Sequence, residues 1–154
     1  MNGFILVDKE TGISSNSIVQ QVKKKLKVKK VGHLGTLDPL AKGLVILAIN
    51  RATKFSSYFL ESDKSYDVQI RLGIATDTDD STGTIIHESQ NYPESESVKK
   101  ELLSFIGESM QVPPFFSALK HKGKPLYKYA REGNFISKPS RRIFISKIEN
   151  FNYK

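Results

Sequence analysis

The sequence predicts an α+β domain with a mixed, mainly antiparallel sheet and flanking helices. Apolar residues recur at helical spacing between positions 16 and 26, whereas positions 66–72 alternate strictly between apolar and polar. Strand-like and helix-like stretches follow one another without the regular βαβ rhythm of a parallel sheet. With 154 residues, of which 38% are hydrophobic, the chain can form a core without disulfides or a structural metal.

The first part of the chain contains clear local signals for two strands and two helices. Ser14, Ser15 and Asn16 are good N-cap residues, and Ile18 and Val22 lie four positions apart on one helical face. Short apolar runs on either side of this helix, one of them ended by the turn 8–12, are typical of buried strands. The predicted elements are a buried strand at 4–7, a helix at 16–26, a buried strand at 43–49 and a short helix at 52–60.

The remainder predicts three more strands and two helices. Ser95 is a candidate N-cap, and Gly123 indicates a turn before the last helix. The acidic stretch 77–82 predicts an exposed turn and not a calcium loop, because Gly83 comes one position too late for an EF-hand. The predicted elements are a half-exposed strand at 66–72, a partner strand at 84–86, helices at 95–106 and 124–132, and a strand at 142–151.

Charge is divided into three blocks along the chain. Residues 1–60 carry ten Lys or Arg against three Asp or Glu, residues 61–110 carry four against eleven, and residues 111–154 carry ten against two, which gives the net charge of +8. Two basic blocks could form one positive face for a polyanion, but they could equally be ordinary solvated surface. The six lysines within 23–30 pose the same choice between a solvated helix end and a phosphate-facing edge.

Several classes of function are disfavoured by composition. The chain has no cysteine, which excludes thiol catalysis, and His33, His87 and His121 are too far apart for a local zinc motif. No apolar run is long enough for a signal peptide or a membrane span. We therefore expect a cytoplasmic protein without a membrane segment or a metal.

The segment 32–39, Gly-His-Leu-Gly-Thr-Leu-Asp-Pro, is the most informative motif. Its two glycines permit a tight turn, and Pro39 keeps Asp38 out of the helical region, so a carboxylate is expected on a rigid, exposed loop. By residue type alone, an ordinary Asp-Pro turn is the alternative. The third glycine of a dinucleotide fingerprint and the Gly-Lys-Ser/Thr of a P-loop are missing.

Four motifs in order give the chain a strong resemblance to the bacterial tRNA pseudouridine-55 synthases of the TruB type. Residues 6–15 are similar to the family's apolar strand with Asp-Lys-Pro-x-Gly, and residues 32–43 to its Gly-His-x-Gly-Thr/Ala-Leu-Asp-Pro-Leu-Ala-x-Gly. Residues 64–78 are similar to its Lys-x-Tyr with Leu-Gly-x-x-Thr-Asp-Thr, and residues 117–131 to its Ser-Ala-x-Lys-x-x-Gly-x-x-Leu-Tyr-x-x-Ala-Arg. A pseudouridine synthase-like catalytic domain is therefore expected.

The resemblance implies an isomerase that converts a uridine in the T loop of tRNA to pseudouridine, without cofactor or metal, by flipping the base and exchanging the glycosidic bond. It implies that Asp38 is the catalytic carboxylate at the ribose, and an ordinary aspartate is ionised at neutral pH. By the same resemblance, Tyr66 stacks on the target and His33 helps to hold the flipped loop. The alternatives are an inward-facing strand aromatic for Tyr66 and a locally bonded loop imidazole for His33.

Aromatic and basic residues are interleaved in the segment 115–131. This mixture suits RNA, because aromatics stack on bases while cations contact phosphates. The alternative is a core aromatic pair beside a solvated basic face. The members of the mixture are Phe115, Phe116, Lys120, Lys122, Lys124, Tyr127, Lys128, Tyr129 and Arg131.

The sequence departs from the family at three places. Glu10 stands where the family has proline, and Lys42 where it often has Thr or Ser. The family's later Lys-Gly-x-Tyr-Ile-Arg segment, whose arginine pairs with the catalytic aspartate, has no counterpart here. We therefore expect residues 1–154 to be the N-terminal portion of the catalytic domain, with the C-terminal catalytic segment and RNA-binding tail absent, and to be inactive or nearly so alone.

Two other hypotheses stay open at this stage. The chain could be a non-catalytic RNA-binding module that keeps the scaffold, or a subunit of an archaeal or eukaryotic guide-RNA synthase, which shares the Asp38 loop. The close match at 117–131 favours the bacterial tRNA branch. A monomer is expected for the full-length protein.

Overall fold

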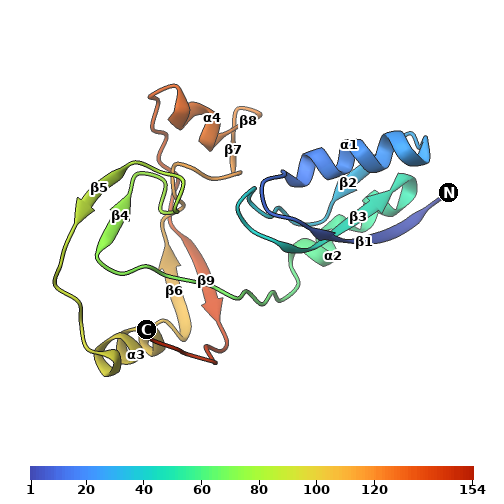
Figure 1. Ribbon diagram of the computed structural model, residues 1–154. Helices are drawn as coiled ribbons and strands as arrows, with labels where there is room; N and C mark the ends of the chain where they lie inside the picture. The colour runs from blue at the N-terminus through green and yellow to red at the C-terminus, as the bar shows by residue number, and fades with distance from the viewer. The chain divides into compact units, whose positions relative to one another are not determined.

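The computed structural model describes residues 1–154 and divides into two compact units, Met1–Asp67 and Val68–Lys154 (Figure 1). All strand pairings in both units are antiparallel. The α+β class predicted from the sequence is therefore confirmed, but the strands form four small sheets and not one. None of the helices combines the length and apolar character that crossing a bilayer requires.

Unit 1 is a three-stranded sheet with strand order β1-β3-β2, and α1 packs on it (Figure 1). The register of β1 on β3 runs from Gly3 opposite Ile49 to Lys9 opposite Gly43. The elements of unit 1 are β1 (Gly3–Lys9), α1 (Ser15–Leu26), β2 (Val31–His33), β3 (Gly43–Ile49), the 3₁₀-helix η1 (Asn50–Phe55) and α2 (Ser56–Leu60).

The core of unit 1 lies mainly between α1 and one face of the sheet. Ile18 and Val19 of α1 pack against Val45 and Leu47 of β3, and all four are buried. Burying a side chain of this size stabilises a fold by roughly 1.5–3 kcal/mol, so this contact decides where α1 sits. A smaller buried cluster consists of Leu34 in the loop after β2, Ala48 of β3 and Ala52 of η1.

The prediction of fully buried strands at 4–7 and 43–49 is half right. Both stretches are strands, but Leu6 and Leu44 are 69% and 59% exposed, and Phe4 is 45% exposed. The reason is that successive side chains of a strand point to opposite faces, and α1 covers only one of them. An uninterrupted apolar run thus leaves apolar side chains on the second face of β1 and β3.

The predicted helix at 16–26 is confirmed as α1, and local chemistry sets both of its ends. Ser14 is the N-cap, and its hydroxyl accepts a hydrogen bond from the Ser17 backbone N–H at 3.0 Å. Lys27 is the C-cap in the left-handed conformation at φ 50°, and its N–H donates to the Lys24 carbonyl.

Unit 2 consists of three two-stranded ladders and two helices. The helices predicted at 95–106 and 124–132 are confirmed in shorter form, and the N-cap of the first is Glu94, not Ser95. The elements are β4 (Ile74–Thr76), β5 (Ile85–Glu88), α3 (Ser95–Ser104), β6 (Gly107–Gln111), β7 (Lys120–His121), β8 (Lys124–Pro125), α4 (Leu126–Arg131) and β9 (Arg141–Ile145).

The predicted strand at 66–72 is wrong. Residues 62–72 form no helix or strand and make no backbone–backbone hydrogen bond. The strand β5 therefore pairs with β4 and not with 66–72. Alternation indicates which faces a strand would have, but an extended segment becomes a strand only where a neighbour satisfies its N–H and C=O groups. The predicted last strand is likewise shorter, because β9 ends at Ile145 where its pairing with β6 ends.

The acidic stretch after β4 is a turn, as predicted. Asp80 Oδ1 accepts hydrogen bonds from the hydroxyls of Thr78 at 2.9 Å and Thr82 at 2.6 Å, and from the Thr82 backbone N–H at 2.8 Å. The hydrogen bond from the Thr82 hydroxyl is the main reason that the pKa of Asp80 is held below its usual value. This carboxylate therefore serves to close the turn between β4 and β5.

Candidate active site

The loop between β2 and β3 in unit 1 carries Asp38. The chain enters it from His33, the last residue of β2, and the next N–H, that of Leu34, donates to the Ile46 carbonyl at 2.8 Å. The Leu34 side chain is buried against Ala48. The first residues of the loop are therefore an extension of the sheet, which fixes the direction in which the chain leaves it.

Ser15 holds the loop on the N-terminal side of Asp38. Its hydroxyl donates to the Leu37 carbonyl at 2.9 Å and accepts from the Leu37 N–H at 3.0 Å. Ser15 is buried and is the first residue of α1. The start of the helix is thus bonded through one side chain to both backbone groups of the residue before Asp38.

Lys9 and Gly12 hold the loop on the other side, at the Pro39 carbonyl. This carbonyl accepts from the Gly12 N–H at 2.7 Å and from Lys9 Nζ at 3.2 Å. The same ammonium group also donates to the carbonyls of Ile13 at 2.9 Å and Glu10 at 3.0 Å. Lys9 is fully buried at 0% exposure, and its three donors meet three carbonyl acceptors.

Lys9 is a functional residue that sequence reasoning missed. A buried charge is unfavourable unless it is well bonded, so its position demands an explanation. The signal was present in the period of β1: Lys9 follows Ile5 and Val7 on the face that α1 covers. A lysine on the inward face at the end of a strand indicates a bonded, structural ammonium group.

Asp38 lies on an exposed loop whose backbone is fixed on both sides, as the Gly and Pro pattern predicted. Its own carbonyl accepts from the Ala41 N–H at 3.1 Å. The carboxylate makes no hydrogen bond and no ion pair, since the chain's ion pairs all lie in unit 2. The backbone of Asp38 is therefore anchored, and its carboxyl group faces solvent.

His33 lies at the start of the same loop and is half-buried. Its Nδ1 is 3.0 Å from the Gly35 carbonyl oxygen, which fits a ring N–H donating within the loop. This is the local hydrogen bond that the sequence left open as the alternative. The bond orients the imidazole, and a role for His33 in holding substrate stays a prediction.

Tyr66 is not brought together with the other two predicted site residues by any contact. It is 65% exposed, lies in the stretch without regular structure, makes no hydrogen bond and stacks on no ring. Two residues earlier, Lys64 Nζ donates to the carbonyls of Leu60 at 3.0 Å and Ser62 at 2.7 Å, after the end of α2. The Lys64 side chain is therefore hydrogen-bonded to the chain around the end of α2, whereas the Tyr66 side chain makes no such bond.

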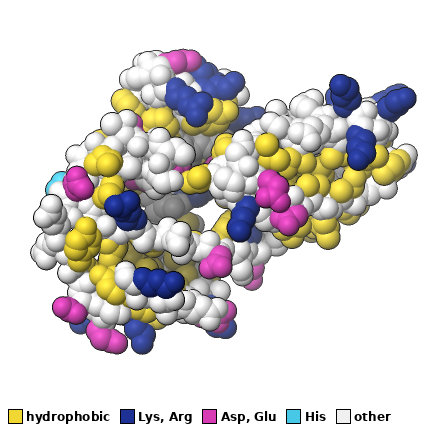
Figure 2. All heavy atoms as spheres, viewed as in Figure 1, with side chains coloured by type: hydrophobic (Ala, Val, Ile, Leu, Met, Phe, Trp, Pro, Cys, Tyr) yellow, Lys and Arg dark blue, Asp and Glu magenta, His cyan; other side chains and the backbone are white.

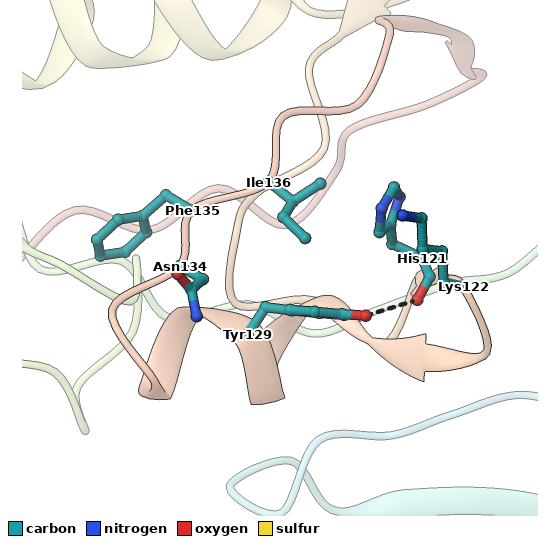
Figure 3. Close-up of a pocket in the computed structure, with 6 residues that line it drawn as sticks. All are labelled: His121, Lys122, Tyr129, Asn134, Phe135 and Ile136. Carbon is teal, nitrogen blue, oxygen red and sulfur yellow. Dashed lines mark hydrogen bonds between the residues drawn. The ribbon is translucent and has the colours of Figure 1, made fainter.

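In unit 2, Lys122 and Tyr129 of the aromatic and basic segment 115–131 line a cavity of about 430 Å³ beside α4 (Figure 3). The Tyr129 hydroxyl donates to the His121 carbonyl at 3.2 Å, and Lys124 Nζ lies 4.5 Å from the centre of the Tyr129 ring. Arg131 lies 5.4 Å from the centre of the Tyr127 ring. The cavity is lined by His121, Lys122, Tyr129, Asn134, Phe135 and Ile136.

The solvated basic face of the alternative is present in the segment 115–131, but its core aromatic pair is not, since Phe115 is 42% exposed and Phe116 is only half-buried. Leu126 and Ala130 of α4 are buried, while Lys122 and Lys128 remain exposed. Cations beside aromatic rings at an open cavity provide stacking faces and positive charge together, the two features that single-stranded RNA requires.

Comparison with known proteins gives a consistent family. Residues 23–154 match the family described as TruB family pseudouridylate synthase, N-terminal domain. The chain is 45% identical over 152 residues to tRNA pseudouridine synthase B of Blochmanniella floridana, covering 99% of this chain and 60% of that protein. It is 46% identical over 146 residues to the enzyme of the same name from Chromohalobacter salexigens, covering 94% and 48%.

A solved structure agrees with the sequence relatives. The crystal structure of a Cbf5-Nop10-Gar1 complex contains a chain with a TM-score of 0.50 and 26% identity, over 78% of this chain and 31% of that one. The present chain spans roughly half of the length of the curated relatives that it matches, from 48% to 60% in the two proteins above.

Proposed function

The chain belongs to the TruB family of pseudouridylate synthases, and we propose on this premise that it serves the conversion of uridine to pseudouridine in RNA. The observation that carries the proposal is the Asp38 loop. Its backbone is bonded on both sides by Ser15 and Lys9, while its carboxylate is left exposed. A fold that fixes a loop this closely around an unpaired carboxylate is arranged to present that group to a ligand.

In the proposed reaction the bond between ribose C1′ and uracil N1 breaks, and a bond between C1′ and C5 forms. N1 gains a proton and C5 loses one, so substrate and product are isomers, and neither oxidant nor cofactor is consumed. Asp38 is the carboxylate at C1′, either as a nucleophile or as the anion that stabilises positive charge there. The base must leave its stack before this can happen.

We further infer that the RNA is the T stem-loop of tRNA. The similarity to proteins named tRNA pseudouridine synthase B supports this choice. The aromatic and basic residues beside α4 support an RNA with unstacked bases, because Tyr127, Tyr129, Lys124 and Arg131 combine ring faces with cations. A tRNA substrate would place the protein in the cytoplasm.

A second candidate function is RNA binding without catalysis. One observation favours it: within unit 1 Asp38 has no cationic partner, and Tyr66 makes no contact with the loop. A cation beside a carboxylate orients it and keeps it ionised. We therefore propose that residues 1–154 alone bind RNA but turn it over poorly, and that the activity belongs to the whole protein.

Asp38→Asn in the protein expressed from its own gene separates the two functions. We expect product formation on a T stem-loop RNA to fall by at least about 10³-fold, which is typical for loss of a central catalytic group. RNA affinity should change little, because the amide keeps the shape of the carboxylate. Pseudouridine is measured by mass spectrometry of nucleosides, and affinity by fluorescence anisotropy.

Asp8→Asn is the matched control, since Asp8 is another exposed aspartate of unit 1. It should leave both activity and affinity unchanged. Turnover that survives Asp38→Asn would refute the proposed catalysis. A loss of RNA affinity as large as the loss of turnover would instead favour the binding module.

A further inference from the structure

Six lysines surround the end of α1 and the loop that follows it, and they are called the lysine cluster below. All six are exposed. Figure 2 shows dark-blue side chains at the end of unit 1 where α1 ends in Figure 1. The lysine cluster consists of Lys23, Lys24, Lys25, Lys27, Lys29 and Lys30.

No carboxylate of unit 1 pairs with the lysine cluster. Residues 11–37 contain no Asp or Glu, and all of the chain's ion pairs lie in unit 2. Solvated lysines on ordinary surfaces are usually mixed with acidic residues, which keeps the local field small. An unbalanced group of this kind has a positive field that attracts polyanions.

The helix dipole explains only part of the lysine cluster. Cations are favourable in the last turn of a helix, where Lys23, Lys24 and Lys25 lie, but the effect falls off beyond that turn. Lys29 and Lys30 follow the left-handed C-cap and gain nothing from it. Their presence requires another reason.

The loop that carries Lys29 and Lys30 is fixed in place by Asn50. The Lys30 N–H donates to Asn50 Oδ1 at 3.0 Å, and the Asn50 N–H donates to the Lys30 carbonyl at 2.8 Å. The Asn50 side-chain amide also donates to the Met1 carbonyl at 2.7 Å. The backbone of the lysine cluster is therefore preorganised, which reduces the entropy cost of binding.

The helix α1 fixes how far the lysine cluster lies from the active-site loop. Its first residue, Ser15, is bonded to Leu37, next to Asp38, and the lysine cluster lies at its other end. At about 1.5 Å per residue the 12 residues of α1 span about 18 Å.

We propose that the lysine cluster binds the phosphate backbone of an RNA stem, about one length of α1 (about 18 Å) away from the uridine at Asp38. The placement of the uridine rests on the proposed function. An anionic membrane is the less suitable partner, because α1 cannot add insertion of its apolar face to the attraction of the charges: Ile18 and Val19 are buried against the sheet.

The test compares two pairs of adjacent, exposed lysines in the 154-residue chain. Lys29→Gln with Lys30→Gln removes two charges from the lysine cluster, while Lys99→Gln with Lys100→Gln removes two charges from α3. Affinity for a T stem-loop RNA and for its loop alone is measured by fluorescence anisotropy at several salt concentrations. Circular dichroism confirms that both variants fold.

We expect the Lys29/Lys30 variant to bind the stem-loop several-fold more weakly. The slope of log K against log salt should become shallower by about one to two, because each phosphate that a lysine neutralises adds about 0.9 to it. Affinity for the loop alone should be unchanged. The Lys99/Lys100 variant should resemble the unmodified chain on both RNAs. Lys29→Arg with Lys30→Arg should restore stem-loop binding, because phosphate binding requires the charge.

Three results would overturn the inference. The two glutamine pairs could weaken binding equally, which would mean that only total charge matters. The Lys29/Lys30 variant could lose affinity for the loop alone, which would place the lysine cluster at the target and not at the stem. The Lys29/Lys30 variant could lose affinity only for phosphatidylserine vesicles and not for the RNA, which would make a membrane the partner. If lysine-dependent stem binding is found but the protein expressed from its own gene forms no pseudouridine, the proposed function fails and the phosphate surface remains.

Discussion

Lys9 and Ser15 hold the loop of Asp38 from outside the motif that contains the aspartate. Lys9 reaches a carbonyl 30 residues away and Ser15 a residue 22 away. The motif at 32–39 predicted an exposed carboxylate on a stiff loop, and that much follows from Gly and Pro chemistry alone. The bonds that stiffen the loop could not be read from it, because they depend on how β1 and α1 pack beside it.

Lys9→Met should weaken this support. The substitution keeps most of the buried side-chain volume but removes the donor from three carbonyls. A hydrogen bond to a charged group contributes about 1.5–3 kcal/mol, and we expect the free energy of unfolding to fall by about 2 kcal/mol. Urea denaturation measures the loss, and faster hydrogen exchange at the Gly12 amide, which donates to Pro39, would locate it in the loop.

Lys42→Met is the control for that experiment. Lys42 lies in the same loop but is exposed and donates no hydrogen bond. It should change stability by less than about 0.5 kcal/mol, as surface substitutions usually do. If the two methionine variants were equally stable, the three carbonyl bonds of Lys9 would contribute nothing.

At the scale of elements, the predictions succeeded where the signal was local. The helix at 16–26 was found because its N-cap serine and its apolar face lie within one stretch of sequence. The strand at 66–72 failed because strand formation depends on a partner that no pattern within those residues describes. The strand β6 was missed for the same reason, since its polar sequence is extended only through pairing with β9.

Gly73 precedes β4, and the ladder of β4 with β5 should depend on it. Its φ is +81°, and a Cβ there would lie 2.6 Å from the Ser89 carbonyl oxygen and 3.0 Å from the Tyr92 ring. Gly73→Ala should therefore lower the free energy of unfolding of unit 2 by at least about 2 kcal/mol, from left-handed strain of about 1–2 kcal/mol plus the clash. Thermal unfolding followed by circular dichroism measures it.

Gly133→Ala separates the two causes. Gly133 has nearly the same φ, +78°, but a Cβ there would meet no atom within 4 Å. It should lose only the strain of about 1–2 kcal/mol. A Gly73 variant no less stable than the Gly133 variant would show that the Ser89 carbonyl can move aside.

At the scale of the whole molecule, the segment between the two units is where the sequence and the structure differ most. Val68 and Ile70 have the alternation of a half-buried strand but are 69% and 63% exposed. Lys64 is bonded after the end of α2, and the next backbone hydrogen bond after 62–72 is that of Gly73. The charge changes from basic to acidic after residue 60, but a change of surface charge does not say where a compact unit ends, so the division near Asp67 could not be predicted.

Limited trypsin digestion should therefore separate the two units first at Lys64 or Arg71. Proteases cut exposed backbone that is not held by backbone hydrogen bonds, and residues 63–71 are exposed and make no backbone–backbone hydrogen bond. Lysines within α1 should resist, because their backbone groups are held in the helix. Mass spectrometry of early time points identifies the cuts.

Lys64→Gln with Arg71→Gln should then delay the separation, whereas Lys99→Gln with Lys100→Gln in α3 should not. The first cut that separates the units could instead lie outside 62–72, or residues 62–72 could stay intact after α1 has been digested. Either result would mean that this segment is protected in solution and that its alternating pattern does indicate a strand.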